Sequence, residues 1–124
     1  DLVRACDYCG VKTGAQEDKF AACKLTAEPA GKVSAPLIAQ SPLSLECRVK
    51  QVLPLGSHDM FLAEVVAVNV DEQYVDKNGK LHLDKCGLVA YAHGEYFELG
   101  AKLGSFGYSV RKKPVTSKRK PKRK

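Results

Sequence analysis

Two long runs in the middle of the chain, LSLECRVKQVL and MFLAEVVAVNV, favour β-strands over helices. In the first run every second residue from Leu43 to Val49 is apolar, which is the period of a strand with one dry and one wet face. The second run is apolar on both faces, as in a strand packed from both sides or lining a closed barrel. We therefore expect a mainly β fold in which the second run is central.

Turn signals place further elements after these runs. Asn78-Gly79 favours a tight hairpin turn, because both residues tolerate positive φ. A second hairpin is expected around His93-Gly94, between GLVAY and EYFEL, and a last short strand at FGYSV. His82 alternates with leucines in KLHLD, so we expect it to be an outward residue of a strand, whereas the turn predicts a solvent-exposed His93.

The first forty residues predict helices and a connection. LVRACDYC can form a short helix that Gly10 ends. The segment TGAQ has the spacing of a capping box, which predicts a second helix from Thr13 to about Lys24. Prolines and small residues dominate residues 29–42, so we expect an extended connection there, with a short edge strand around Val33.

The formal charge of +6 comes from the C-terminal end of the chain. Nine Lys and Arg residues and no acid follow Val110, so the preceding body is net acidic. Residues 111–124 contain one apolar residue, which predicts a disordered basic tail after a domain that spans residues 1–110. Such a tail can bind RNA or DNA phosphates non-specifically, although basic ends also occur as solvating appendages.

Other classes of protein are disfavoured by what the sequence lacks. The 124 residues contain no apolar stretch of bilayer length and no signal-peptide start, which predicts a soluble protein without membrane contact, and the odd number of scattered cysteines favours a reducing cytoplasm. The five cysteines suggest no disulfide framework, and Cys6-x-x-Cys9 is half of a zinc motif without a second pair, so we expect no metal site. No dinucleotide, phosphate-loop, serine-nucleophile or HExxH motif is present.

The polar triplet Ser57-His58-Asp59 follows a glycine and precedes the apolar run, at the mouth of a buried strand. Mouths of barrels hold ligands, and Gly56 allows a backbone to approach a ligand closely. The alternative is a turn whose polar side chains satisfy its own backbone groups. The residues alone leave both interpretations open.

Six segments in order resemble the flavin reductase-like family: CGVKTG, DKFAACKLT, KVSAPLIAQSPLSLECRV, LGSHDMFLAEVVAV, LVAYAHGEYFELG and LGSFGYSV. Members of this family, which includes flavoredoxin-like proteins, fold as FMN-binding split β-barrels. The resemblance therefore implies a partial split β-barrel with one or two short helices near the N-terminus. The opening third of the family's domain, with its first barrel strands, is expected to be absent.

The resemblance also implies a site. Gly56-Ser57-His58 resembles the family's Gly-Asp-His motif, with serine in place of the middle acid and Asp59 after the histidine. His58 is thereby implied to be catalytic, orienting the nicotinamide of NAD(P)H beside the flavin. The other residues implied to bind the cofactor are Cys9, Gly10, Thr13, Gly14, Lys19, Phe20, Gly56, Ser57, Asp59, Tyr91 and Tyr96.

Two functions from different classes follow from these features. The resemblance implies an FMN-binding oxidoreductase, forming a homodimer, that transfers hydride from NAD(P)H to flavin and on to a small-molecule or protein acceptor. The alternative is a non-catalytic β-barrel module that binds nucleic acid through residues 111–124.

Overall fold

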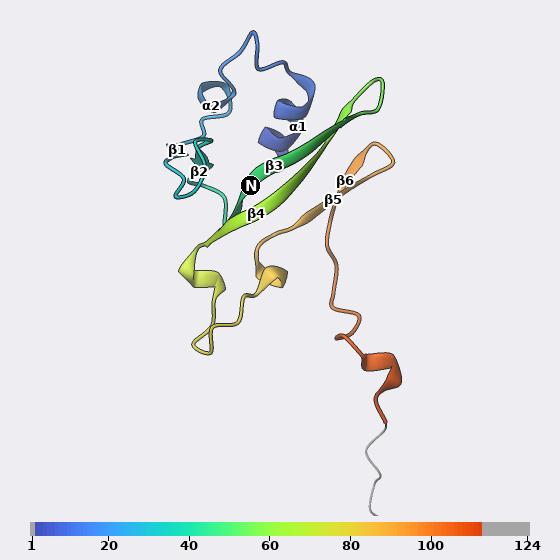
Figure 1. The fold of residues 1–124 in the computed structure, drawn as a ribbon. Helices are drawn as coiled ribbons and strands as arrows, with labels where there is room; N and C mark the ends of the chain where they lie inside the picture. The colour runs from blue at the N-terminus through green and yellow to red at the C-terminus, as the bar shows by residue number, and fades with distance from the viewer. Residues whose placement is uncertain (1, 113–124) are drawn as a thin grey trace, which may run out of the picture.

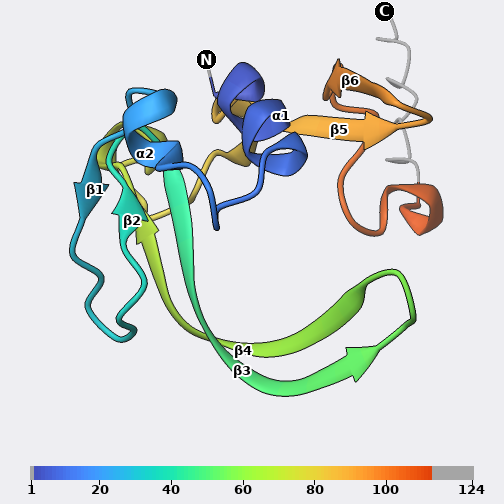
Figure 2. The same ribbon diagram turned by 90° about the horizontal axis from the view of Figure 1, so that it is seen from above.

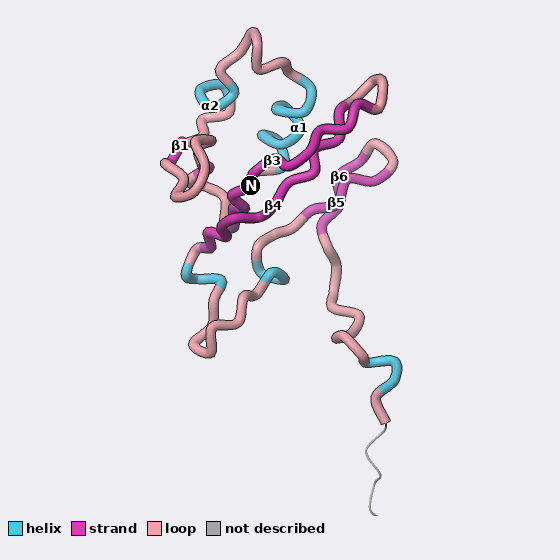
Figure 3. The backbone as a smooth tube through the Cα atoms, viewed as in Figure 1, coloured by secondary structure: helices cyan, strands magenta, loops and turns pink. Residues whose placement is uncertain are grey.

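The computed structural model describes residues 2–112 and is mainly β (Figures 1 and 3). Its strands form three separate two-stranded antiparallel sheets, which do not close into a barrel within the described residues. None of the helices in this part of the chain is long and apolar enough to cross a membrane. The elements in chain order are α1 (Val3–Val11), α2 (Lys19–Ala22), β1 (Ala27–Glu28), β2 (Leu37–Ile38), β3 (Leu43–Pro54), β4 (Asp59–Val70), η1 (Glu72–Tyr74), η2 (Leu83–Lys85), β5 (Val89–Ala92), β6 (Glu95–Glu98) and η3 (Tyr108–Val110).

The largest element is the hairpin of β3 and β4, which confirms the two long strands expected from the sequence. The strands pair from Leu43 opposite Val70 to Pro54 opposite Asp59, with irregularities after Glu46 and Val49. Bulges of this kind bend a strand and increase its twist. Figure 2 shows the resulting curved ribbon, with α1 and the β5–β6 hairpin on its concave side.

The expected burial of this hairpin is wrong. The apolar side chains Leu45 and Val49 are each 52% exposed, whereas the acidic Glu46 is 2% exposed. In residues 2–112 β4 pairs with β3 alone, so it is not a central strand, and Phe61 is 61% exposed. The reason is that the described residues supply no layer to cover either face, while hydrogen bonds to Glu46 draw that one side chain inward.

The Glu46 carboxylate organises the segment before the hairpin. It accepts hydrogen bonds from the backbone N–H groups of Gly31 (3.0 Å), Lys32 and Val33 (3.2 Å), and from the side-chain amide of Asn69 (2.9 Å). The Asn69 bond, followed by the backbone bonds, holds the pKa of Glu46 below its usual value against the opposing effect of burial. Since these donors point at the carboxylate, the expected strand around Val33 does not form; residues 31–35 are a bend, flanked by the short pair β1 and β2.

The helices differ from the expectation at their ends. Helix α1 forms as predicted, but it continues through Gly10, and Lys12 caps it in an extended conformation. The capping box at Thr13 is wrong: Thr13 Oγ1 accepts from the Ala15 N–H (3.3 Å) in a local turn, and α2 begins instead after Asp18. The Asp18 side chain accepts from the Ala21 N–H (3.1 Å), which is the geometry of an N-cap.

A turn forms at Asn78-Gly79 as expected, but only Gly79 has positive φ and no paired strands flank the turn; a side-chain interaction joins its ends. Gly79 has φ 78°, and an isolated bridge pairs Val75 with Leu81. His82 is not in a strand but precedes η2, and its Nε2 lies 3.0 Å from Asp76 Oδ2. This hydrogen bond, followed by the N–H groups of Lys80 and Asn78, lowers the pKa of Asp76 to about 2.

The hairpin of β5 and β6 is also confirmed. His93 (φ 52°) and Gly94 (φ 85°) both have positive φ, as a tight two-residue turn requires, and His93 is exposed. The strand expected at FGYSV is wrong. Gly107 has φ 75°, residues 108–110 form η3, and no strand among the described residues lies beside them to pair with.

Replacing Glu46 by alanine should lower the Tm by roughly 5–15 °C, because the N–H groups of residues 31–33 lose a shared acceptor. Differential scanning fluorimetry measures the change. The matched control is Glu64→Ala on β4, since Glu64 is exposed and pairs with Lys50 at 2.7 Å on the surface. Equal Tm values for the two variants would contradict the structural role of Glu46.

The Asp76 carboxylate predicts a dependence of stability on pH. Its pKa is lower in the folded chain (about 2) than its ordinary value of 3.8, so its contribution is fully present above about pH 4 and is lost as pH falls towards 2. Asp76→Asn should therefore lower the urea midpoint near pH 6 and converge with the parent near pH 2. Asp84→Asn is the control, because Asp84 lies farther from His82 (3.6 Å) and is exposed. A constant difference between Asp76→Asn and the parent from pH 6 to 2 would refute this assignment.

Candidate functional site

The residues implied to form the site fall into three groups on different parts of the fold (Figure 1). One group lies on α1, α2 and the connection between them, one at the tip of the β3–β4 hairpin, and one on β5 and β6. The members are Cys9, Gly10, Thr13, Gly14, Lys19 and Phe20 in the first group, Gly56, Ser57, His58 and Asp59 in the second, and Tyr91 and Tyr96 in the third.

Lys19 is the centre of the first group. Its Nζ donates a hydrogen bond to the Cys9 carbonyl oxygen (2.6 Å), in the last turn of α1, where cations are favoured. A Cβ at Gly14 would lie 3.8 Å from Lys19 Cε, so the segment that joins α1 to α2 packs against the lysine side chain. Phe20 is half-buried, whereas Gly10 and Thr13 are exposed. The lysine thus joins the start of α2 to the end of α1.

A second contact supports the same junction. The Tyr8 hydroxyl donates a short hydrogen bond to the Glu17 carboxylate, which crosses from α1 to the segment before α2. That bond is the main reason why the pKa of Tyr8 is raised.

The tip of the β3–β4 hairpin presents His58. The turn is closed by a hydrogen bond from the Leu55 N–H to the His58 carbonyl oxygen (2.8 Å), and Gly56 adopts φ 90°. Ser57 Oγ lies 2.9 Å from His58 Nδ1, so the serine fixes one side of the imidazole. Asp59 begins β4 opposite Pro54. All four tip residues are exposed, and in the described part of the chain no protein group contacts His58 Nε2 through a hydrogen bond.

Two tyrosines connect the third group to α1. The rings of Tyr91 and Tyr96 lie with centroids 5.0 Å apart and planes tilted by 57°. The Tyr96 hydroxyl donates a hydrogen bond to Asp7 Oδ1 (3.2 Å) on α1. Partial burial, followed by this bond, raises the pKa of Tyr96. The first and third groups are therefore both bonded to α1, through Lys19 and Tyr96.

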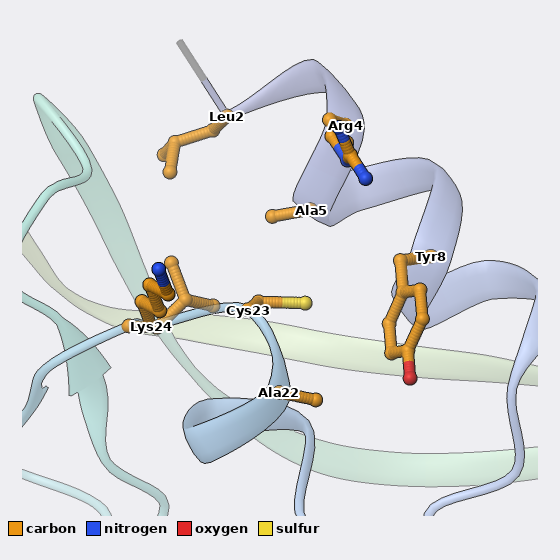
Figure 4. A pocket seen from close by; sticks show the side chains of 8 residues that line it. Leu2, Arg4, Ala5, Tyr8, Ala22, Cys23 and Lys24 are labelled. Atoms are coloured by element: carbon orange, nitrogen blue, oxygen red, sulfur yellow. The ribbon is translucent and has the colours of Figure 1, made fainter.

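The hairpin tip does not join these groups within residues 2–112. Figure 2 shows it separated from α1, α2 and the β5–β6 hairpin. A cavity of about 430 Å³ lies between α1 and the end of α2, but it includes none of the implied site residues (Figure 4). Its lining was not anticipated, because no motif marks these side chains: Leu2, Arg4, Ala5, Tyr8, Ala22, Cys23, Lys24 and Leu25.

Two further expectations from the sequence concern a bound metal ion and nucleic acid. Among residues 2–112 no cluster of three or more His, Cys, Asp or Glu side chains could hold a metal ion, and Cys6 of the half zinc motif is exposed on α1. The basic residues 113–124 lie outside the described residues. Nucleic-acid binding by the tail therefore stays a prediction.

Comparison with known proteins identifies the family. Residues 1–100 match the model of the flavin reductase like domain, and the chain belongs to this family. Flavoredoxin of Desulfovibrio vulgaris (Miyazaki F) superimposes with a TM-score of 0.79 at 30% identity, covering 89% of this chain and 60% of that one. Flavoredoxin from Methanosarcina acetivorans gives 0.74 at 28% identity, with the same coverage of the two chains.

Other matches agree with the fold. A Shewanella frigidimarina protein with a split barrel domain gives a TM-score of 0.70 at 24% identity, over 86% of this chain and 55% of that one. A relative from Archaeoglobus fulgidus is 33% identical over 88 residues, which are 71% of this chain and 49% of the relative. The expected split-barrel fold is thus confirmed, although the chain spans only about half to three fifths of the length of these proteins.

Proposed function

We propose that the chain carries part of the flavin site of an FMN-dependent oxidoreductase that accepts hydride from NAD(P)H. The observation that carries the proposal is the family match over residues 1–100, supported by similarity to two flavoredoxins at 28% and 30% identity. The flavin would supply the redox chemistry, and the protein would supply binding, orientation and polarity.

The residue types suit a flavin, but the described residues do not enclose one. A lysine ammonium has three donors, so Lys19 can bind a phosphate while it keeps its bond to the Cys9 carbonyl. Tyr91 and Tyr96 offer aromatic surface beside the same helix. The hairpin tip with His58 lies apart from both. A complete site therefore requires additional protein surface.

We propose that a second copy of this chain supplies part of that additional surface, beside the part of the family's domain that this chain does not span. Large apolar side chains are exposed along the hairpin and the C-terminal segment: Phe61 is 61% exposed, Leu103 95% and Phe106 fully. The C-terminal segment projects away from the rest of the described chain (Figure 1). Exposed apolar surface on this scale is stabilised when further protein surface covers it. A homodimer would cover it and bring separate groups together.

His58 is the residue proposed to act on the nicotinamide. Its Nδ1 is occupied by Ser57 Oγ at 2.9 Å, which leaves Nε2 to face a ligand. The positive φ of Gly56 places the imidazole at the outermost point of a long, paired hairpin, where it can reach into a site on another surface. The role proposed for His58 is to orient the hydride donor, because small errors of placement greatly slow a transfer reaction. The electron acceptor is proposed to be a small molecule or a protein.

Titration of the purified chain with FMN tests the cofactor. Flavin fluorescence should be quenched with saturation near one FMN per chain, and light scattering should give the mass of a dimer. A variant that ends at Val110 is the control: it should bind FMN equally well, since the tail is not part of the proposed site. Unquenched fluorescence together with a monomeric mass would refute the proposal.

His58→Ala should slow flavin reduction by NAD(P)H about 10- to 100-fold in stopped-flow traces, while the Kd for FMN changes less than about threefold. The matched control is His93→Asn, which removes an exposed imidazole from the other hairpin turn and leaves a residue that tolerates positive φ. Equal reduction rates in the two variants would show that His58 is only a turn residue.

A further inference from the structure

The two asparagines of the chain lie in opposite surroundings. Asn78 is exposed in the turn between η1 and η2, and no group in residues 2–112 forms a hydrogen bond with its side-chain amide. Gly79 follows it directly, and a Cβ placed on this glycine would meet nothing within 4 Å. Asn69, in contrast, is half-buried, donates to the Glu46 carboxylate (2.9 Å) and precedes the β-branched Val70.

These surroundings differ in a way that matters for covalent chemistry. Asparagine is thermolabile, because the backbone nitrogen of the next residue can attack the carbonyl carbon of its side chain. A following glycine leaves that nitrogen most accessible, since it has no side chain to obstruct the approach, whereas a β-branched residue hinders it. The sequence and the exposure therefore make Asn78 the reactive asparagine and Asn69 the protected one.

The fold restrains the attacking nitrogen at Gly79. Its N–H donates a hydrogen bond to the Asp76 carbonyl oxygen (2.8 Å). The Asp76 carboxylate closes the same turn, because one oxygen accepts from the N–H groups of Asn78 (2.8 Å) and Lys80 (3.1 Å). Its other oxygen lies 3.0 Å from His82 Nε2. The nitrogen is thus free to react only when the turn opens, and the bonds to Asp76 determine how often this happens.

We propose that Asn78 is a site of spontaneous deamidation and that the Asp76 carboxylate, through the turn that it closes, controls the rate of the reaction. The co-reactant is water. The inference goes beyond the proposed flavin chemistry and does not depend on it, because the turn contains none of the implied site residues.

The reaction balances in two steps. In the first, the Gly79 nitrogen forms a bond to Asn78 Cγ, the bond from Cγ to the side-chain nitrogen breaks, and ammonia leaves with the proton of the Gly79 N–H. The product is a succinimide ring. In the second, water opens the ring at either carbonyl, so that hydroxide adds to the carbon and a proton returns to the ring nitrogen. The result is aspartate or isoaspartate, without any transfer of electrons.

Both products disturb the turn that restrains them. A carboxylate at position 78 adds a negative charge two residues from Asp76, whose own pKa is held at about 2, chiefly by His82. Like charges so close together repel. Isoaspartate also lengthens the main chain, which moves the N–H groups that Asp76 gathers. The modified chain should therefore unfold at a lower temperature than the fresh chain.

Incubation of the 124-residue chain at mildly alkaline pH and physiological temperature tests the proposal. Cleavage after glutamate separates the two asparagines into the peptides 65–72 and 73–95. Mass spectrometry should show that peptide 73–95 gains about one dalton while peptide 65–72 stays unchanged. The modified chain should also accept methyl groups from an isoaspartate methyltransferase. A synthetic peptide of residues 73–95 gives the rate without the fold, and the folded chain should react more slowly.

Variants of the turn test the control by Asp76. Asp76→Ala should deamidate roughly 3- to 10-fold faster than the parent, because the turn loses its shared acceptor, and circular dichroism checks that the variant is folded. The matched control is Asp84→Ala, since Asp84 is exposed and lies 3.6 Å from His82 Nδ1; its rate should equal that of the parent.

Three results would overturn the proposal. The first is a parent chain whose peptide 73–95 keeps its mass for as long as the synthetic peptide needs to react completely. The second is a folded chain that reacts as fast as that peptide. The third is an equal rate in Asp76→Ala and the parent.

Discussion

The carboxylate of Glu46 is the interaction on which the arrangement of this chain depends. It is a buried acid that gathers three successive backbone N–H groups and the amide of Asn69, and so joins the loop at residues 31–33 to both strands of the long hairpin. Hydrogen bonds to an ionised acceptor are stronger than neutral ones, which offsets the cost of burying the charge. With little apolar burial elsewhere in residues 2–112, this polar centre fixes where β3 begins and β4 ends.

Once the base of the β3–β4 hairpin is fixed, local bulges, turns and hydrogen bonds determine where the three groups of implied site residues lie. The bulges after Glu46 and Val49 curve the ribbon, and the glycine-containing turn at its far end presents His58. On the concave side, α1 is the common support: Lys19 reaches it from α2, and Tyr96 reaches it from β6 through Asp7. The implied site residues thus lie on two supports, α1 and the β3–β4 hairpin, and the curvature of the hairpin sets how far apart these supports are.

Local patterns in the sequence predicted the elements that local chemistry determines. The period of two gave β3, and the paired positive-φ residues at His93-Gly94 gave the turn of the β5–β6 hairpin. The error at Thr13 arose because two capping residues compete in that segment, and Asp18, directly before Lys19, provides the stronger N-cap. That signal was present in the sequence and could have been weighed.

Contacts between distant residues could not be predicted in this way. Glu46 was assigned to a wet face because its donors lie 13 to 15 residues upstream and belong to the backbone, which carries no sequence signature. The bond between Asp7 and Tyr96 spans 89 residues. The site residues came from family resemblance rather than from chemistry visible in the pattern.

The outer edge of β4 is open to pairing with a further strand. Within residues 2–112 this twelve-residue strand has one edge without a partner strand, and much of its apolar surface is uncovered. An open, apolar edge is a template for pairing with any extended chain nearby, including newly synthesised ones. Pairing along this edge would extend the β3–β4 sheet by a third strand, whichever chain or segment supplies it.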